Sequence, residues 1–149
     1  MFARAQRLLL DSSVGVYEPT VTHTDIVYRR SRLQSIGDML YVVPFTDCTC
    51  WFVRRDVLQA VPPVDISINR YGWGISVAIA AACRINNKLC IRDYGIRVHH
   101  PRGRGYPAAA ALAERTAYFR CLSPSMRAQI RGLYGERALL NGLGGENAI

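Results

Sequence analysis

Two glycines flank a tryptophan directly before a predicted helix, in the run Gly72-Trp73-Gly74. Glycine lets the backbone approach a ligand closely, and the amino terminus of a helix carries a partial positive charge. The face of the Trp73 indole is also the kind of surface on which sugar rings stack. The run therefore predicts either a binding site for a sugar or a tryptophan that covers the core at a tight turn.

A histidine and a basic loop follow a predicted strand, at His100 and residues 101–106. In this loop Arg102 and Arg104 alternate with glycines, and Tyr106 ends it. Arginine forks and the N–H groups of glycine-rich loops bind phosphate, and neutral imidazole binds divalent metals. The loop predicts a phosphate site, with the alternative of a solvated basic loop that contains a structural histidine.

The chain is basic, with 19 Lys and Arg against 11 Asp and Glu and a formal net charge of +8 in 149 residues. All the basic residues except Lys88 are arginine, whose planar fork suits phosphate and carboxylate. Nucleic acid, a nucleotide diphosphate or an anionic lipid surface would fit this charge. The arginines are scattered through every segment and no nucleic-acid reader motif is present, which makes nucleic acid the weaker alternative.

The cysteine count and the apolar runs indicate the class of protein. Five cysteines without paired C-x-x-C spacing argue against a disulfide framework or a zinc ribbon. No apolar run reaches the roughly twenty residues that span a bilayer. We expect one domain in the cytoplasm, without a secretion signal or a transmembrane segment, with the inner membrane surface as an alternative peripheral location.

The hydrophobic pattern predicts helices and strands in mixed order. Helices are expected over residues 3–10, 55–60, 75–85 and 108–122, followed by a last helix with Ser123 as N-cap and Pro124 as its first residue. Strands are expected over residues 14–17, 40–43, 49–53, 89–93 and 96–99. Pro19 should end the first strand, and the runs over 40–43 and 49–53 should lie near a sheet edge. The fold class is α/β, with a C-terminal helical pair.

Four motifs in consistent order make residues 3–107 resemble bacterial family-2 glycosyltransferases. They are Val-Gly-Val-Tyr-Glu-Pro at 14–19, Thr-Asp-Cys-Thr-Cys-Trp-Phe-Val-Arg-Arg at 46–55, Tyr-Gly-Trp-Gly-Ile at 71–75 and Val-His-His-Pro-Arg-Gly-Arg-Gly-Tyr at 98–106. The resemblance implies a GT-A-like mixed sheet flanked by helices, a nucleotide-sugar donor, a glycan acceptor, and Mg2+ or Mn2+. Residues 1–107 would be the acceptor-side half, and residues 108–149 a helical extension of the same compact domain.

The resemblance assigns roles to individual residues. His100 would bind the metal or the diphosphate, with Arg102, Arg104 and Tyr106 as substrate-binding residues in the same loop. Trp73 and Gly74 would border the acceptor sugar. Asp47 matches a carboxylate position near the acceptor, where it could hydrogen-bond a sugar hydroxyl; the equal alternative is an aspartate that shapes a turn.

Two departures from the family pattern bear on activity. Ser76 stands where an acidic residue usually follows Gly-Trp-Gly-Ile, and an unperturbed serine cannot take the proton of the attacking hydroxyl. Asp47 is the one nearby carboxylate that could replace it as base. The seven aspartates are isolated, so the chain has no Asp-x-Asp pair to hold a cation, and such a pair is expected before residue 1.

These observations define the expected function and its alternatives. We expect a glycosyltransferase-like protein that takes part in sugar transfer from a nucleotide sugar and is inactive without the nucleotide-binding half. That half would come from a companion chain or from a longer gene product. The alternatives are a non-catalytic homodimer that hides an exposed sheet edge, and a basic nucleic-acid-binding module.

Overall fold

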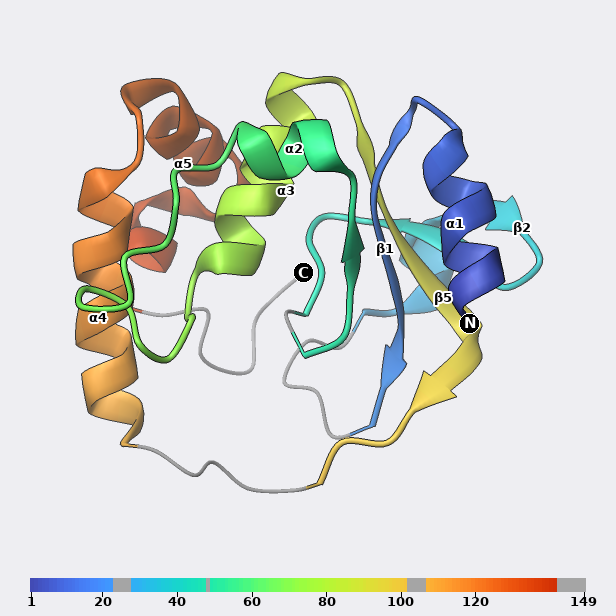
Figure 1. The fold of residues 1–149 in the computed structure, drawn as a ribbon, viewed down its shortest axis with the longest axis horizontal. Helices are drawn as coiled ribbons and strands as arrows, with labels where there is room; N and C mark the ends of the chain where they lie inside the picture. Colours follow the sequence, from blue (N-terminus) through green and yellow to red (C-terminus); the bar gives the residue numbers. More distant parts are fainter. Residues whose placement is uncertain (23–27, 48, 102–106, 142–149) are drawn as a thin grey trace.

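The chain folds into one mixed sheet with helices on both faces (Figure 1). The computed structural model describes residues 1–22, 28–47, 49–101 and 107–141, with side chains described as far as residue 133. In chain order the elements are α1 (Phe2–Leu10), β1 (Val14–Val21), the 3-10 turn η1 (Arg30–Arg32), β2 (Gln34–Gly37), β3 (Leu40–Val43), β4 (Phe52–Val53), α2 (Arg55–Gln59), α3 (Ile75–Ile85), β5 (Leu89–Val98), α4 (Ala108–Cys121) and α5 (Pro124–Asn141). The predicted α/β class and C-terminal helical pair are confirmed.

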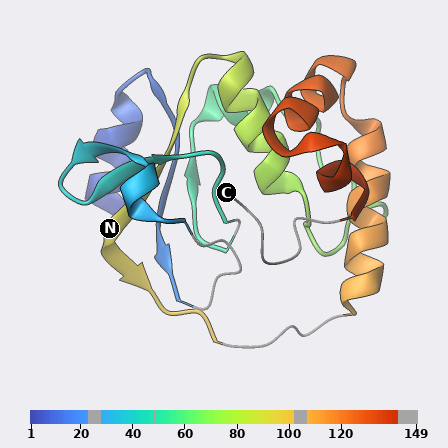
Figure 2. The ribbon, with the colours of Figure 1, turned by 180° about the vertical axis from the view of Figure 1, so that it is seen from behind.

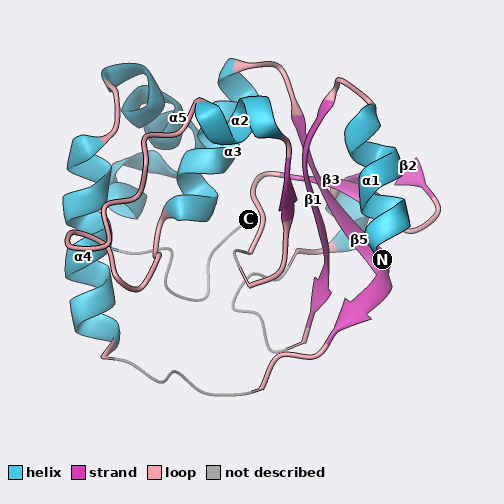
Figure 3. Cartoon of the chain, viewed as in Figure 1, coloured by secondary structure: helices cyan, strands magenta, loops and turns pink. Residues whose placement is uncertain are grey.

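The sheet has the strand order β2-β3-β5-β1-β4 (Figure 3). Its centre is a parallel pair, β1 and β5, in which Tyr17 lies beside Ile91 and Glu18 beside Arg92. The other pairings, β1 with β4, β3 with β5 and β2 with β3, are antiparallel. The carboxyl ends of the two central strands therefore lie at the same edge of the sheet.

Each face of the sheet carries its own hydrophobic cluster, because successive strand residues point to opposite sides. One cluster includes Tyr17 and Ile91 and packs under α1. The other includes Val16 and Cys90 and packs under α3, α4 and α5. Figure 2, seen from behind, again has α1 on one side of the sheet and these three helices on the other.

A buried polar network attaches α1 to its face of the sheet. Asp93 on β5 is fully buried, and its Oδ2 atom accepts a hydrogen bond of 2.9 Å from the Tyr17 hydroxyl. The same oxygen lies 2.8 Å from Nε of Arg4 on α1. Because a buried carboxylate is strongly destabilising without partners, this pairing fixes where α1 lies.

Helix α3 is deeply buried, and all of its residues from Ser76 to Cys83 are inaccessible or nearly so. It spans Ile75–Ile85 with Asn86 as its C-cap, followed by Asn87 with a φ of 52°, so the bounds predicted for this helix are confirmed. Apolar as α3 is, none of the helices in the described part of the chain is long and apolar enough to cross a membrane.

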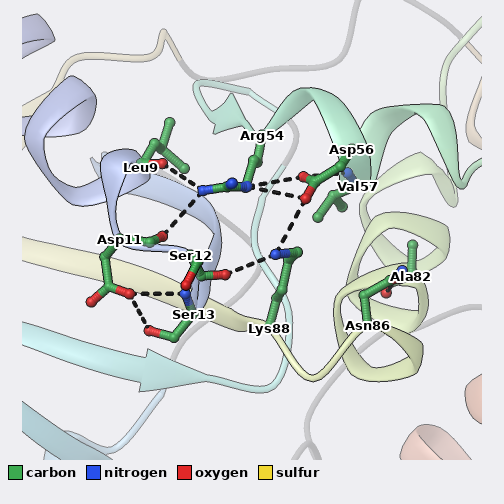
Figure 4. A network of polar contacts seen from close by, with 10 residues as sticks. All are labelled: Leu9, Asp11, Ser12, Ser13, Arg54, Asp56, Val57, Ala82, Asn86 and Lys88. Carbon is green, nitrogen blue, oxygen red and sulfur yellow. Dashed lines mark hydrogen bonds and ion pairs between the residues drawn. The ribbon is translucent and has the colours of Figure 1, made fainter.

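A polar network closes the end of the sheet at which β1 and β5 begin (Figure 4). Arg54 donates to the carbonyl oxygen of Leu9 at 2.9 Å and pairs with Asp56 at 3.1 Å. Lys88 lies 3.3 Å from the other Asp56 oxygen and donates to the carbonyl oxygen of Ser12 at 2.7 Å. The end of α1, the start of α2 and the start of β5 are thereby joined.

Two predictions about strand boundaries are wrong. β1 continues through Pro19 to Val21, because β4 pairs only with Val16 and Tyr17, so Pro19 needs no N–H on that side. The segments predicted as two strands, over 89–93 and 96–99, are the single strand β5. Its pairing with β1 shifts between Pro19 and Thr20, which places an irregularity inside a continuous strand.

The structure also tests the predictions about which strands lie near the edges of the sheet. The residues of β4 lie on one edge of the sheet, as predicted, but the strand has only two residues. β3 lies next to the other edge, as predicted, with β2 paired to its outer side. β2 was not predicted, since all four of its residues are exposed and carry no hydrophobic alternation.

The predicted cap of the last helix is present, and its loss should be measurable. Ser123 Oγ accepts a hydrogen bond of 3.3 Å from the Met126 N–H, and Pro124 is the first residue of α5. We expect Ser123→Ala to lower the free energy of unfolding by about 1 kcal/mol, because it leaves one helix N–H unpaired. Urea unfolding tests this, with Ser123→Thr as the control that keeps the hydroxyl. Equal losses in both variants would contradict it.

Candidate functional site

The carboxyl-terminal edge of the parallel pair is where an α/β sheet of this kind binds ligands. The Thr22 N–H donates to the Val98 carbonyl oxygen at 3.0 Å, so β1 and β5 stay joined up to this edge. Helix α3 directly precedes β5 and runs in the opposite direction, so its first turn points toward the edge (Figure 1). Of the predicted site residues, Asp47 donates to Glu18 on β1 and His100 donates to Thr22, directly after β1.

A tight turn holds Trp73 at the amino terminus of α3. Gly72 and Gly74 both adopt left-handed conformations, with φ values of 70° and 89°. The buried Asn69 side chain donates from Nδ2 to the Trp73 carbonyl oxygen at 2.9 Å. Trp73 itself is half-buried. The sequence therefore placed the tryptophan and the two glycines correctly with respect to the helix.

Helix α4 fixes this turn from the other side. Glu114 accepts hydrogen bonds from the Arg70 N–H at 2.8 Å and from Arg70 Nε at 2.9 Å. A Cβ atom on Gly74 would lie 2.7 Å from Phe119 and 2.8 Å from Arg115, both on α4. The close approach that requires glycine at position 74 is thus an approach of α4. The role of Gly74 and Trp73 beside a sugar stays a prediction.

A buried ion pair joins the two central strands below the edge. Glu18 is 0% exposed and Arg92 is 4% exposed, and Arg92 Nε donates to Glu18 Oε1. The guanidinium carbon of Arg92 also lies 4.9 Å from the centre of the Tyr28 ring. Burial raises the pKa of Glu18 to about 7, although the Arg92 charge and its hydrogen bond act in the opposite direction.

Asp47 lies next to this pair and forms a turn. Its N–H donates to Glu18 Oε2 at 2.6 Å. Its own Oδ1 atom accepts from the Thr49 N–H at 3.0 Å and from the Thr49 hydroxyl at 2.8 Å. This is the turn-forming aspartate that the sequence offered as an alternative. The catalytic assignment of Asp47 stays a prediction, and the structure adds that a buried carboxylate lies against its backbone.

His100 is held by its backbone at the end of β5. Its N–H donates to Thr22 Oγ1 at 2.9 Å, and within the described residues its imidazole makes no hydrogen bond. Arg102, Arg104 and Tyr106 lie outside the described residues. In the part of the chain that the structure describes, no three His, Cys, Asp or Glu side chains are grouped as metal ligands.

Ser76 occupies the first turn of α3 and is 8% exposed, as expected for an N-terminal helix residue. The predicted residues are held by separate elements: Asp47 by β1, His100 by the segment after β1, and Trp73 by Asn69. No role was predicted for Glu18, Arg92 or Arg115, all of which are buried. For Glu18 and Arg92, the sequence did contain a signal, because each is a charged residue inside an apolar strand.

The described chain thus holds an indole at a helix amino terminus, an imidazole after β5 and a buried carboxylate–guanidinium pair on the central strands, each on its own element. Such a set can stack a sugar ring, attract an anionic group and hydrogen-bond hydroxyls. Comparisons of the chain with family models, curated proteins and solved structures find no match.

Proposed function

We propose that the chain is a glycosyltransferase-like protein whose described site binds the acceptor sugar. The observation that carries the proposal is the position of Trp73. It sits between two left-handed glycines at the head of α3, half-buried, where that helix points toward the carboxyl ends of β1 and β5. This geometry suits a sugar ring that stacks on the indole, and it agrees with the order of motifs shared with family-2 glycosyltransferases.

The chemistry of the proposed transfer is incomplete in this chain. Ser76 cannot act as a base, and Glu18 is fully buried and already bound to Arg92 and to the Asp47 N–H. Asp47 remains the carboxylate nominated to contact a sugar hydroxyl. His100 would be one ligand for Mg2+ or Mn2+, but the described residues do not supply a full ligand set.

Tryptophan fluorescence tests the acceptor site directly, because the chain has two tryptophans. In Trp51→Phe, Trp73 is the sole emitter, and we expect saturable fluorescence change on addition of the correct mono- or oligosaccharide. Trp73→Phe, in which Trp51 emits alone, is the matched control and should give no change. Calorimetry should show that Trp73→Ala weakens glycan binding by about tenfold or more, the effect of losing one stacking contact plus its buried area.

The donor side is tested by titration of UDP- and GDP-sugars in the presence of Mn2+. Metal-dependent binding that is lost in His100→Ala and kept in His99→Ala would support the nucleotide-sugar assignment. If neither glycans nor nucleotide sugars bind, alone or with a protein that supplies a nucleotide-binding half, the proposed function is wrong.

A further inference from the structure

Arg115 is a buried cation for which the described residues provide no counter-charge. It lies on α4 and is 3% exposed, and its Nε and Nη2 atoms have no hydrogen-bond partner in the described part of the chain. The guanidinium carbon lies 5.5 Å from the centre of the Phe119 ring, one turn further along the helix. A guanidinium does not lose its proton at any ordinary pH, so it cannot avoid the penalty of burial by becoming neutral.

The surroundings of Arg115 add to this penalty. Its Cγ atom would lie 2.8 Å from a Cβ on Gly74, so the side chain passes directly over the N-cap of α3. The first turn of an 11-residue helix carries a partial positive charge and N–H groups without helical acceptors. The neighbouring carboxylate on α4, Glu114, is bound to Arg70. Two positive features therefore meet where the described residues provide no negative one.

A second unpartnered donor lies on the same helix face. The residues of α4 that are buried are Ala111, Arg115, Tyr118 and Phe119, which follow the spacing of one helical face. The Tyr118 hydroxyl is buried and has no hydrogen-bond partner within residues 1–22, 28–47, 49–101 and 107–141. The buried face of α4 thus presents a guanidinium and a hydroxyl that both lack partners among the described residues, and none of its buried residues is acidic.

We propose that Arg115 and the amino-terminal turn of α3 form a binding site for a phosphate group. The arginine fork and helix N–H groups are the two donor types that bind tetrahedral oxyanions best in proteins. A phosphate would neutralise the buried guanidinium and the positive end of α3 together. Desolvation lowers the pKa of Arg115, in keeping with a cation that lacks its partner. The inference stands whether or not the chain binds sugars.

Unfolding in urea tests this site with inorganic phosphate as the probe, at constant ionic strength made up with chloride. The unfolding midpoint of the native sequence should rise with phosphate concentration, because phosphate binds the folded state. In Arg115→Met this rise should vanish, while Arg120→Met, which removes an exposed arginine from the same helix, should keep it. Calorimetry should give a dissociation constant at least about tenfold higher in Arg115→Met, the factor for one charge-assisted hydrogen bond.

Three comparisons make the result specific. Arg115→Met should fold with a midpoint at or above that of the native sequence when phosphate is absent, because it removes an unpaired buried charge. Tighter binding of UDP than of phosphate would identify a nucleotide as the source of the group, and equal affinities would identify free phosphate. A phosphate effect of equal size in Arg115→Met, no effect on the native sequence, or an equal effect of acetate would overturn the proposal.

Discussion

Arg92→Met should lower the free energy of unfolding by about 3 to 5 kcal/mol at pH 8, the loss typical of removing one partner from a buried ion pair. The substitution leaves Glu18, which is fully buried, without the guanidinium that pairs with its Oε1 atom. It also removes the cation that lies over the Tyr28 ring. Urea unfolding measures the loss. The double variant Glu18→Gln/Arg92→Met is the control and should recover most of it, since no charge of this pair remains buried.

The size of this effect should depend on pH in a defined direction. Burial raises the pKa of Glu18 from its model-compound value of 4.5 to about 7, so the folded state prefers the protonated form. The stability that Glu18 contributes is present below about pH 4.5 and is lost as the pH rises through about 7. Arg92→Met should therefore be less damaging at pH 5 than at pH 8. If Glu18→Gln leaves the pH dependence unchanged between these values, the raised pKa is wrong.

Gly74→Ala should lower the free energy of unfolding by about 3 kcal/mol or more, from two separate causes. The φ of 89° disfavours any residue with a Cβ, and that Cβ would lie 2.7 Å from Phe119 Cε1 and 2.8 Å from Arg115 Cγ. Gly37→Ala separates the causes, because Gly37 has a φ of 96° and no atom within 4 Å of its Cβ position.

We expect Gly37→Ala to cost only the backbone strain of about 1 to 2 kcal/mol. The difference between the two variants then measures how tightly α4 packs on the head of α3. Urea unfolding gives both values, and circular dichroism verifies that the variants fold. If Gly74→Ala is as stable as Gly37→Ala or more stable, α4 does not pack closely against Gly74.

The predictable parts of the fold are those that depend on residues close together in the sequence. The bounds of β3, the start of α5 at Ser123–Pro124 and the end of α3 at Asn86 all follow from short apolar runs, caps and breakers. The wrong predictions concern strands whose limits depend on neighbours. Pro19 is compatible with β1 only because β4 stops short of it, and no property of residues near Pro19 reveals that.

In the candidate site, too, some features could be predicted from neighbouring residues, whereas others depend on distant contacts. The position of Trp73 at the head of a helix could be read from its flanking glycines and the apolar run that follows. The pairing of Glu18 with Arg92 joins residues 74 positions apart and depends on the register of β1 and β5. The burial of Arg115 depends on how α4 packs over Gly74, which the helical pattern alone does not contain.

The parallel pairing at the centre of the sheet has a consequence for the order in which the chain acquires its structure. β1 lies near the start of the chain, whereas its parallel neighbour β5 comes after α3. The bond between Glu18 and Arg92 joins residues 74 positions apart. Closing so long a loop costs conformational entropy before the contacts between the strands can offset that cost. Contacts between residues so far apart in sequence therefore slow folding. During synthesis β1 must therefore wait for most of the chain, and docking of β5 should be the rate-limiting event in refolding.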